Sequence, residues 1–135
     1  MRLMVLALIL LMTNRLAAQS CSNLGQTPST AFPVCGSSTF SQANVPLCVS
    51  HVLKVPGCSG GQNQYEDRNP FWYTFTCYQS GTLGFLITPN NMSDDYDWML
   101  YDITGRNPDE VFTNTNIIVT GNWAGTFGLT GASSS

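Results

Sequence analysis

The sequence predicts an all-β fold, specifically an antiparallel, disulfide-containing β-sandwich of the jelly-roll type. Aromatic and polar residues alternate with the period of a strand through much of residues 71–101. Glycine and proline recur too often for a long helix. An isolated hairpin is marginally stable, so such strands need a second sheet that buries one face. Because the strands are fewer than a jelly roll usually has, we expect the domain to be truncated at the C-terminus.

Residues 1–18 have the three-part layout of a secretory signal peptide. Arg2 precedes the apolar run 3–12, and Ala17 and Ala18 supply the small residues of a cleavage site. The apolar run is too short to cross about 30 Å of hydrocarbon as a helix. A lipid anchor on Cys21 is the alternative, but Ala18 fits a lipobox poorly. We expect cleavage after Ala18 and a secreted or cell-surface protein with no transmembrane segment afterwards.

Five cysteines follow this segment, and export favours disulfides between them. No C-x-x-C pair is present and there is a single histidine, so a zinc site is not expected. An odd number leaves one thiol free, paired between chains, or waiting for a partner outside this sequence. A disulfide between Cys48 and Cys58 would hold together the two ends of residues 49–55, although other pairings of the five cysteines stay open. The disulfide candidates are Cys21, Cys35, Cys48, Cys58 and Cys77.

The exported chain divides into two regions. Residues 19–61 are rich in Pro, Gly, Ser and Cys, which predicts an irregular segment of the sandwich with one short strand at residues 49–55. Residues 62–135 hold the sandwich core, which we expect to be incomplete. Its first two strands, residues 71–78 and 82–88, alternate around a turn and predict a hairpin. The inward-facing residues of the returning strand are Leu83, Phe85 and Ile87.

The rest of the core predicts two more strands and one helical turn. Residues 96–101 alternate as a third strand, and residues 116–120 form a fourth. Between them, residues 107–110 read Asn-Pro-Asp-Glu, which is typical of the start of a short helix. The glycine-rich tail after residue 120 carries no strand signal.

Charge and motifs exclude two functional classes. The formal net charge is -3 and only five residues are Lys or Arg, so the basic surface that binds nucleic acid is missing. His51 is the single histidine, and H-E-x-x-H does not occur. We therefore expect no enzymatic activity, and we interpret His51 as a strand residue on a half-exposed face.

An acidic cluster is the one constellation with evident chemistry. Calcium takes several oxygen ligands, which clustered carboxylates supply together with Asn90 or Asn91. Asp102 lies about 16–17 Å along a straight strand from the cluster and is excluded. The commoner interpretation is a solvated loop whose Asp side chains bond turn backbone. The possible calcium ligands are Asp94, Asp95 and Asp97.

Aromatic residues offer a second possible site. An exposed platform of rings could stack on sugars or on a partner's aromatic side chains, although aromatics more often fill sandwich interiors. The candidates for such a platform are Trp72, Tyr78, Trp98, Tyr101 and Trp123.

Several blocks in order resemble a known family. They are CSNLGQTPSTAFPVCG, VPGCSG, NPFWYTFTCYQSGTLGFLITP, DDYDWMLYDITG, NPDEVFT, GNWAG and GLTGAS. Together they are similar to the secreted N-terminal β-sandwich module of large bacterial surface proteins with PKD-like repeats and a gliding-motility-associated (type IX secretion) C-terminal sorting domain. The resemblance implies that the module continues with another cysteine and a last hydrophobic strand.

A looser similarity covers only the central half of the chain. The patterns W-Y-x-F-T, G-T-L and D-x-D-x-x-L-Y-D occur in the same order in pre-peptidase C-terminal and CUB-like domains. Domains of that kind are accessory modules of secreted proteins, and some bind calcium or matrix polymers. Similarity of fold alone does not transfer those activities.

The resemblances imply two functional hypotheses. The first is a non-catalytic structural or adhesive module of an exported cell-surface protein, with downstream domains of the same polypeptide as partners. The alternative is an accessory substrate-binding module of a secreted hydrolase, which holds the enzyme on extracellular polysaccharide or protein.

Overall fold

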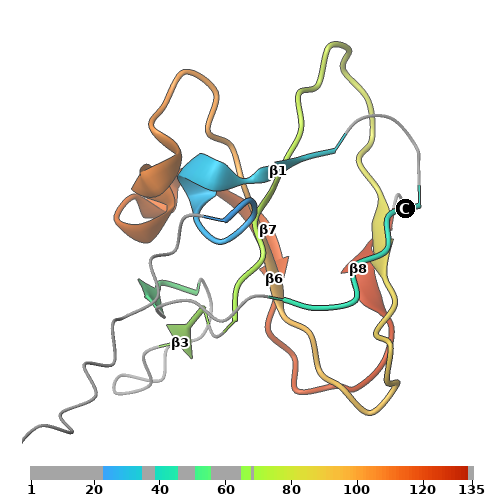
Figure 1. The fold of residues 1–135 in the computed structure, drawn as a ribbon. Coiled ribbons are helices and arrows are strands. Elements are labelled where there is room, and N and C mark those ends of the chain that lie inside the picture. Colours follow the sequence, from blue (N-terminus) through green and yellow to red (C-terminus); the bar gives the residue numbers. More distant parts are fainter. Residues whose placement is uncertain (1–22, 35–38, 46–50, 56–64, 68, 134–135) are drawn as a thin grey trace, which may run out of the picture.

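The computed structural model describes residues 23–34, 39–45, 51–55, 65–67 and 69–133. Within these ranges the chain is β-rich and has no α-helix (Figure 1). The strands are β1 (Phe32–Pro33), β2 (Val52–Leu53), β3 (Tyr65–Glu66), β4 (Tyr73–Thr74), β5 (Phe85–Ile87), β6 (Trp98–Tyr101), β7 (Ile118–Asn122) and β8 (Thr130–Ala132). Three 3₁₀ turns accompany them: η1 (Pro28–Thr30), η2 (Pro108–Phe112) and η3 (Thr115–Ile117).

The described strands form four two-stranded ribbons, not two continuous sheets. Three of the ribbons, β2–β3, β5–β8 and β6–β7, are antiparallel. The fourth, β1–β4, is parallel, which corrects the prediction of a purely antiparallel arrangement. Parallel pairing needs a long connection, and the chain between Pro33 and Tyr73 is long enough to supply it. The β-rich class is therefore confirmed, whereas two packed sheets are not seen among these residues.

The predicted hairpin between residues 71–78 and 82–88 is wrong. β4 pairs with β1, where the Phe32 N–H donates to the Trp72 carbonyl over 2.8 Å. β5 instead pairs with β8, in the glycine-rich tail that carried no strand signal. Alternation locates a strand and its two faces, but it does not say which distant segment will pair with it.

The alternation within β5 is largely as expected. Phe85 and Ile87 are half-buried, while Leu86 between them is 66% exposed. Leu83 was expected to face inward, but it lies before the strand begins and is exposed. The inner face of this strand is thus two residues long.

The third and fourth predicted strands are present as β6 and β7, and they pair with each other. The helical turn between them is also confirmed, as η2. Asn107 caps it, because its side chain accepts from the Asp109 N–H over 3.0 Å and its own N–H donates to Glu110 over 3.3 Å. Pro108 at the first position needs no hydrogen bond there.

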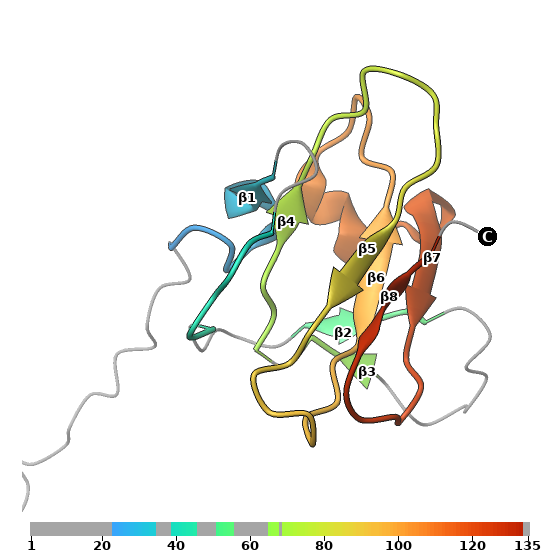
Figure 2. The ribbon, with the colours of Figure 1, turned by 90° about the vertical axis from the view of Figure 1, so that its right-hand side faces the viewer.

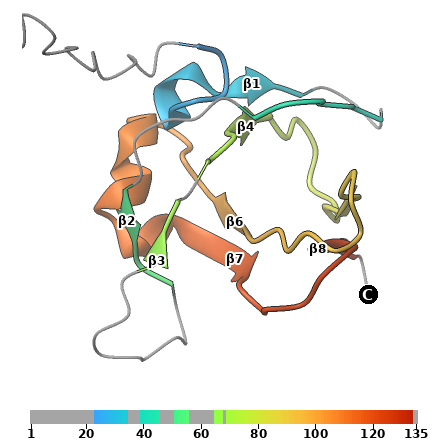
Figure 3. The same ribbon diagram turned by 60° about the horizontal axis from the view of Figure 1, so that its bottom comes forward.

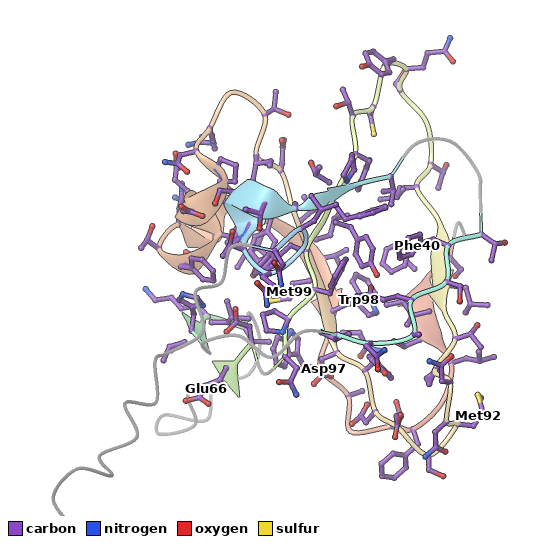
Figure 4. All side chains as sticks on the ribbon, viewed as in Figure 1. Phe40, Glu66, Met92, Asp97, Trp98 and Met99 are labelled. Atoms are coloured by element: carbon purple, nitrogen blue, oxygen red, sulfur yellow. The ribbon has the colours of Figure 1, made fainter. Side chains whose placement is uncertain are left out.

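Trp98 joins the β6–β7 ribbon to the β5–β8 ribbon. Its ring meets Phe85 edge-on, with centroids 4.8 Å apart, and its Nε1 donates to Thr130 Oγ1 over 3.1 Å. Asn122 Nδ2 donates to the same hydroxyl over 3.0 Å. Figure 2 shows the two ribbons overlapping in projection, and Figure 4 shows Trp98 between them. A single side chain therefore links both strands of one ribbon to the other.

The buried apolar core is small. Only three large apolar side chains of the described ranges are buried, namely Leu53, Val111 and Ile117, from β2, η2 and η3. Thirteen large hydrophobic side chains in the same ranges are exposed. Because each fully buried aliphatic side chain contributes about 1.5–3 kcal/mol, these three alone cannot hold all four ribbons together.

A second group of rings joins β1 to β4. Phe32, Phe40, Phe71 and Tyr73 contact one another with centroids 4.8–6.5 Å apart. The Tyr73 hydroxyl also donates to Gln42 over 2.9 Å. These tilted and edge-on contacts add stabilisation beyond the area that they bury.

Of the five cysteines, Cys77 alone lies within the described ranges. Cys77 is an exposed free thiol. The other four candidates, including the predicted pair Cys48 and Cys58, lie outside these ranges, as does the predicted signal peptide. In the part of the chain that the structure covers, no helix has the length and apolar character needed to cross a membrane.

Gly131 sets the close approach of β8 to β5, and this can be tested. Its φ is 154°, and a Cβ at this position would lie 2.2 Å from the Phe85 carbonyl oxygen. We expect Gly131→Ala to lower the free energy of unfolding by about 1–3 kcal/mol, measured by urea denaturation. Gly81→Ala is the matched control, because a Cβ there has no neighbour within 4 Å. Equal effects of the two substitutions would contradict the assigned pairing.

Candidate functional site

The acidic loop, residues 88–97, connects β5 to β6 and begins with a tight turn. The Asn91 carbonyl oxygen accepts from the Asp94 N–H over 2.9 Å, and the Asn91 side chain accepts from the Ser93 N–H over 3.0 Å. This is an Asx turn, in which a short polar side chain replaces a backbone partner. The side chain that accepts the hydrogen bond of this turn belongs to Asn91. The predicted calcium ligands come after it in the sequence.

A sequence-distant loop, residues 123–129, packs against the acidic loop. The Gly128 N–H donates to the Asp94 carbonyl oxygen over 3.0 Å. A Cβ at Gly128, whose φ is 93°, would lie only 3.1 Å from the Met92 methyl group. The sequence does not predict this contact, because no local pattern in the glycine-rich tail indicates which loop it will contact.

Asp95 and Asp97 interact electrostatically, and both lie in the loop before β6. Partial burial and the negative charge of Asp95 together raise the pKa of Asp97 above its ordinary value. All three predicted ligands, Asp94 included, are exposed. Within the described ranges no three His, Cys, Asp or Glu side chains converge in a way that could hold a metal ion. The calcium site stays a prediction.

Asp102 plays a separate, local role. Its Oδ1 accepts from the Thr104 N–H over 2.9 Å, and hydrogen bonds from Thr104 lower the pKa of its carboxyl group. This is the turn chemistry of an exposed Asp at a strand end.

His51 and Asp67 form the most elaborate polar contact in the described ranges. His51 Nδ1 lies 3.3 Å from Asp67 Oδ2, and the His51 N–H donates to Asp67 Oδ1. In return, the Asp67 N–H donates to the His51 carbonyl oxygen over 3.1 Å. The Asp67 side chain is only 4% exposed, whereas that of His51 is 40% exposed. A buried carboxylate is therefore bonded to a histidine that reaches solvent.

Aromatic rings surround this pair. The His51 ring stacks on Phe112 of η2, with centroids 4.1 Å apart and planes inclined by 23°. Trp72 meets Phe112 edge-on at 5.8 Å and contacts Tyr101 at 6.0 Å. Burial and the charge of Asp67 raise the pKa of Tyr101 to about 12.

The pair resembles the base half of a catalytic triad, because a buried carboxylate on Nδ1 leaves Nε2 available as a proton acceptor. Catalysis would also need a nucleophile within hydrogen-bond reach of the ring. In the part of the chain that the structure describes, His51 is bonded to Asp67 and stacked on Phe112. The contact therefore supports a structural role. The sequence predicts His51 on a half-exposed strand face but does not indicate Asp67, because the two residues lie sixteen positions apart.

The five aromatic residues considered for a platform do not share one exposed face. Trp72, Trp98 and Tyr101 are half-buried and contact other rings. Trp123 is also half-buried, and Tyr78 alone is almost fully exposed, at 92%.

An open groove runs along the β5–β8 ribbon. Its volume is about 660 Å³, and it is shallow and open to solvent. Leu86 and Leu129 line it and are 66% and 56% exposed. The remaining lining residues are Gly84, Phe85, Asn122, Thr130, Gly131, Ala132 and Ser133. The groove has no charged side chain, so it favours an apolar or backbone-mediated contact over ionic recognition.

Comparisons of this chain with protein-family models, with curated proteins and with solved structures found no match.

The acidic loop leads to a test with calcium and pH. The raised pKa of Asp97 means that the folded protein binds this proton more tightly than the unfolded chain does. Its contribution to stability is thus present below the ordinary Asp pKa and lost as pH rises through the folded value. We expect Asp97→Asn to raise the melting temperature at pH 7 without calcium, and Asp109→Asn, on η2, to lack this effect.

If the loop binds calcium, calcium should reverse the order of the melting temperatures of the wild-type protein and Asp97→Asn. Added calcium should then raise the melting temperature of the wild-type protein and leave that of Asp97→Asn unchanged. A wild-type melting temperature that does not respond to calcium contradicts the calcium site.

Proposed function

We propose that the chain is a non-catalytic structural or adhesive module of an exported cell-surface protein. In this proposal it belongs to a disulfide-containing β-sandwich that further polypeptide completes, as the family resemblance implies. Its partners are downstream domains of the same polypeptide and extracellular polysaccharide or protein.

The observation that carries this proposal is the balance of buried and exposed apolar side chains. Three large apolar side chains of the described ranges are buried, against thirteen that are exposed. Leu86 and Leu129 lie together along the β5–β8 ribbon, and exposed apolar side chains that gather in one place are typical of regions that pack against another polypeptide. It supports a module whose stability and function depend on what it contacts.

The junction at Trp98 supports the sandwich part of the proposal. Sandwiches bury inward-facing side chains between two layers of strands. Trp98 and Phe85 contact each other from different ribbons, and Thr130 adds a hydrogen bond across the same gap. This is the kind of contact that a sandwich interior would contain.

The ring geometry favours the structural or adhesive role over the alternative, an accessory module that stacks on polysaccharide. Sugars stack on flat, exposed rings, whereas four of the five candidate rings are half-buried. Tyr78 alone is almost fully exposed, and one ring does not make a platform. We therefore place the partner-binding surface on the β5–β8 groove and not on the aromatic residues.

A charge placed in the groove tests this function. Leu86 is exposed, so Leu86→Glu should change the free energy of unfolding by no more than about 0.5 kcal/mol. The same change should weaken attachment of cells that display the exported protein, because a carboxylate in an apolar contact must lose its water. Attachment to protein-coated and polysaccharide-coated surfaces is the measurement.

Val119→Glu is the matched control, since Val119 is a strand residue that is 58% exposed on β7. Attachment should stay at the wild-type level in that variant. Unchanged attachment of Leu86→Glu at equal surface display would contradict the assignment of the groove.

A further inference from the structure

The ribbon β2–β3 is short and depends on its attachment to the rest of the fold. Its register pairs Val52 with Glu66 and Leu53 with Tyr65, and His51 and Asp67 are the next facing pair. Two-stranded ribbons are marginally stable alone. Leu53 is buried, and Figure 3 shows β2 beside the 3₁₀ turns that carry Phe112. The contacts of His51 thus lie where the ribbon meets η2.

We propose that His51 and Asp67 form a pH-dependent latch, which holds the β2–β3 ribbon against η2 more tightly when the His51 ring carries a proton. This inference concerns regulation of the fold and goes beyond the proposed function.

Two contacts strengthen when the ring is charged. A neutral ring gives the buried Asp67 carboxylate one ordinary hydrogen bond, whereas a charged ring adds an opposite charge at 3.3 Å. The stacked face of Phe112 also attracts a cation more than a neutral ring. Histidine changes charge between pH 5 and 8, and the partly exposed ring can exchange its proton with solvent.

The titratable groups near His51 either favour the folded state when they are protonated, as His51 does, or do not titrate between pH 6 and pH 8. Burial raises the pKa of Asp67, and the hydrogen bonds and charge of His51 offset only part of that effect. Protonation of Asp67 therefore also favours the folded state, but at lower pH. Tyr101, on β6, stays neutral because its pKa is about 12.

The other charged side chains on the packed elements are few. The ribbon carries Lys54, next to β2, and Glu66. On η2, Asp109 is exposed, and Glu110 accepts hydrogen bonds from Arg106 and Asn114 over 3.3 and 3.2 Å. His51 is the only histidine in the sequence, so a change in stability between pH 8 and pH 6 can be traced to one ring.

The test measures the folding equilibrium constant of this chain at pH 8 and pH 6 by urea denaturation. The wild-type constant should rise by about fivefold at pH 6, the usual gain when one partner of a hydrogen bond becomes charged. His51→Asn keeps an amide donor near Asp67 but cannot titrate, so its constant should not rise. Asp67→Asn should lose the rise as well, whereas Glu110→Gln should keep it.

Three results would overturn the latch. They are a wild-type constant that does not change with pH, a rise of equal size in His51→Asn, and a loss of the rise in Glu110→Gln. If the variants do not fold, the wild-type protein still decides the matter, because its single histidine gives one set of ring signals in NMR spectra. A ring titration midpoint that is no higher in the folded protein than in urea would also overturn the proposal.

Discussion

The arrangement of the ribbons depends on the Trp98 junction, because the described residues bury so few apolar side chains. An indole ring from β6 reaches Phe85 on β5 and Thr130 on β8, so it bonds both strands of the opposite ribbon. The Thr130 hydroxyl also accepts from Asn122, on β7. Removing any one of these groups would leave a polar atom without its partner or a ring without its contact.

Elsewhere the fold relies on the same combination of rings and polar contacts. On one side, Phe32 and Tyr73 join the parallel β1–β4 ribbon. On another side, Phe112 stacks on His51, which bonds a buried carboxylate. Such contacts have defined geometry but contribute only about 0.5–1.5 kcal/mol each beyond burial. A module held in this way keeps apolar surface exposed, and this links its packing to the proposed role as part of a larger assembly.

The sequence located elements better than it located their partners. Alternation of β-forming residues was sufficient to predict the strands around Phe85, Trp98 and Ile118, and Asn107-Pro108 was sufficient to predict a capped turn. Pairing depends on long-range packing, so the partners of β4 and β5 were not predictable. At the acidic loop, Asp95 and Asp97 interact electrostatically, but both precede β6, so the period of a strand does not explain their proximity. The covering loop at Gly128 and the partner of His51 left no local pattern, because both contacts join segments that are distant in sequence.

The most direct test of this account is a double-mutant cycle on the Trp98 junction. Trp98→Phe keeps an aromatic ring opposite Phe85 and removes the Nε1 donor, and Thr130→Val removes the hydroxyl that accepts from it. If this hydrogen bond links the ribbons, the free energies of unfolding should show a coupling of about 1 kcal/mol between the two substitutions. Additive effects, with a coupling energy of zero, would show that the two residues do not interact and would contradict the proposed packing of the ribbons.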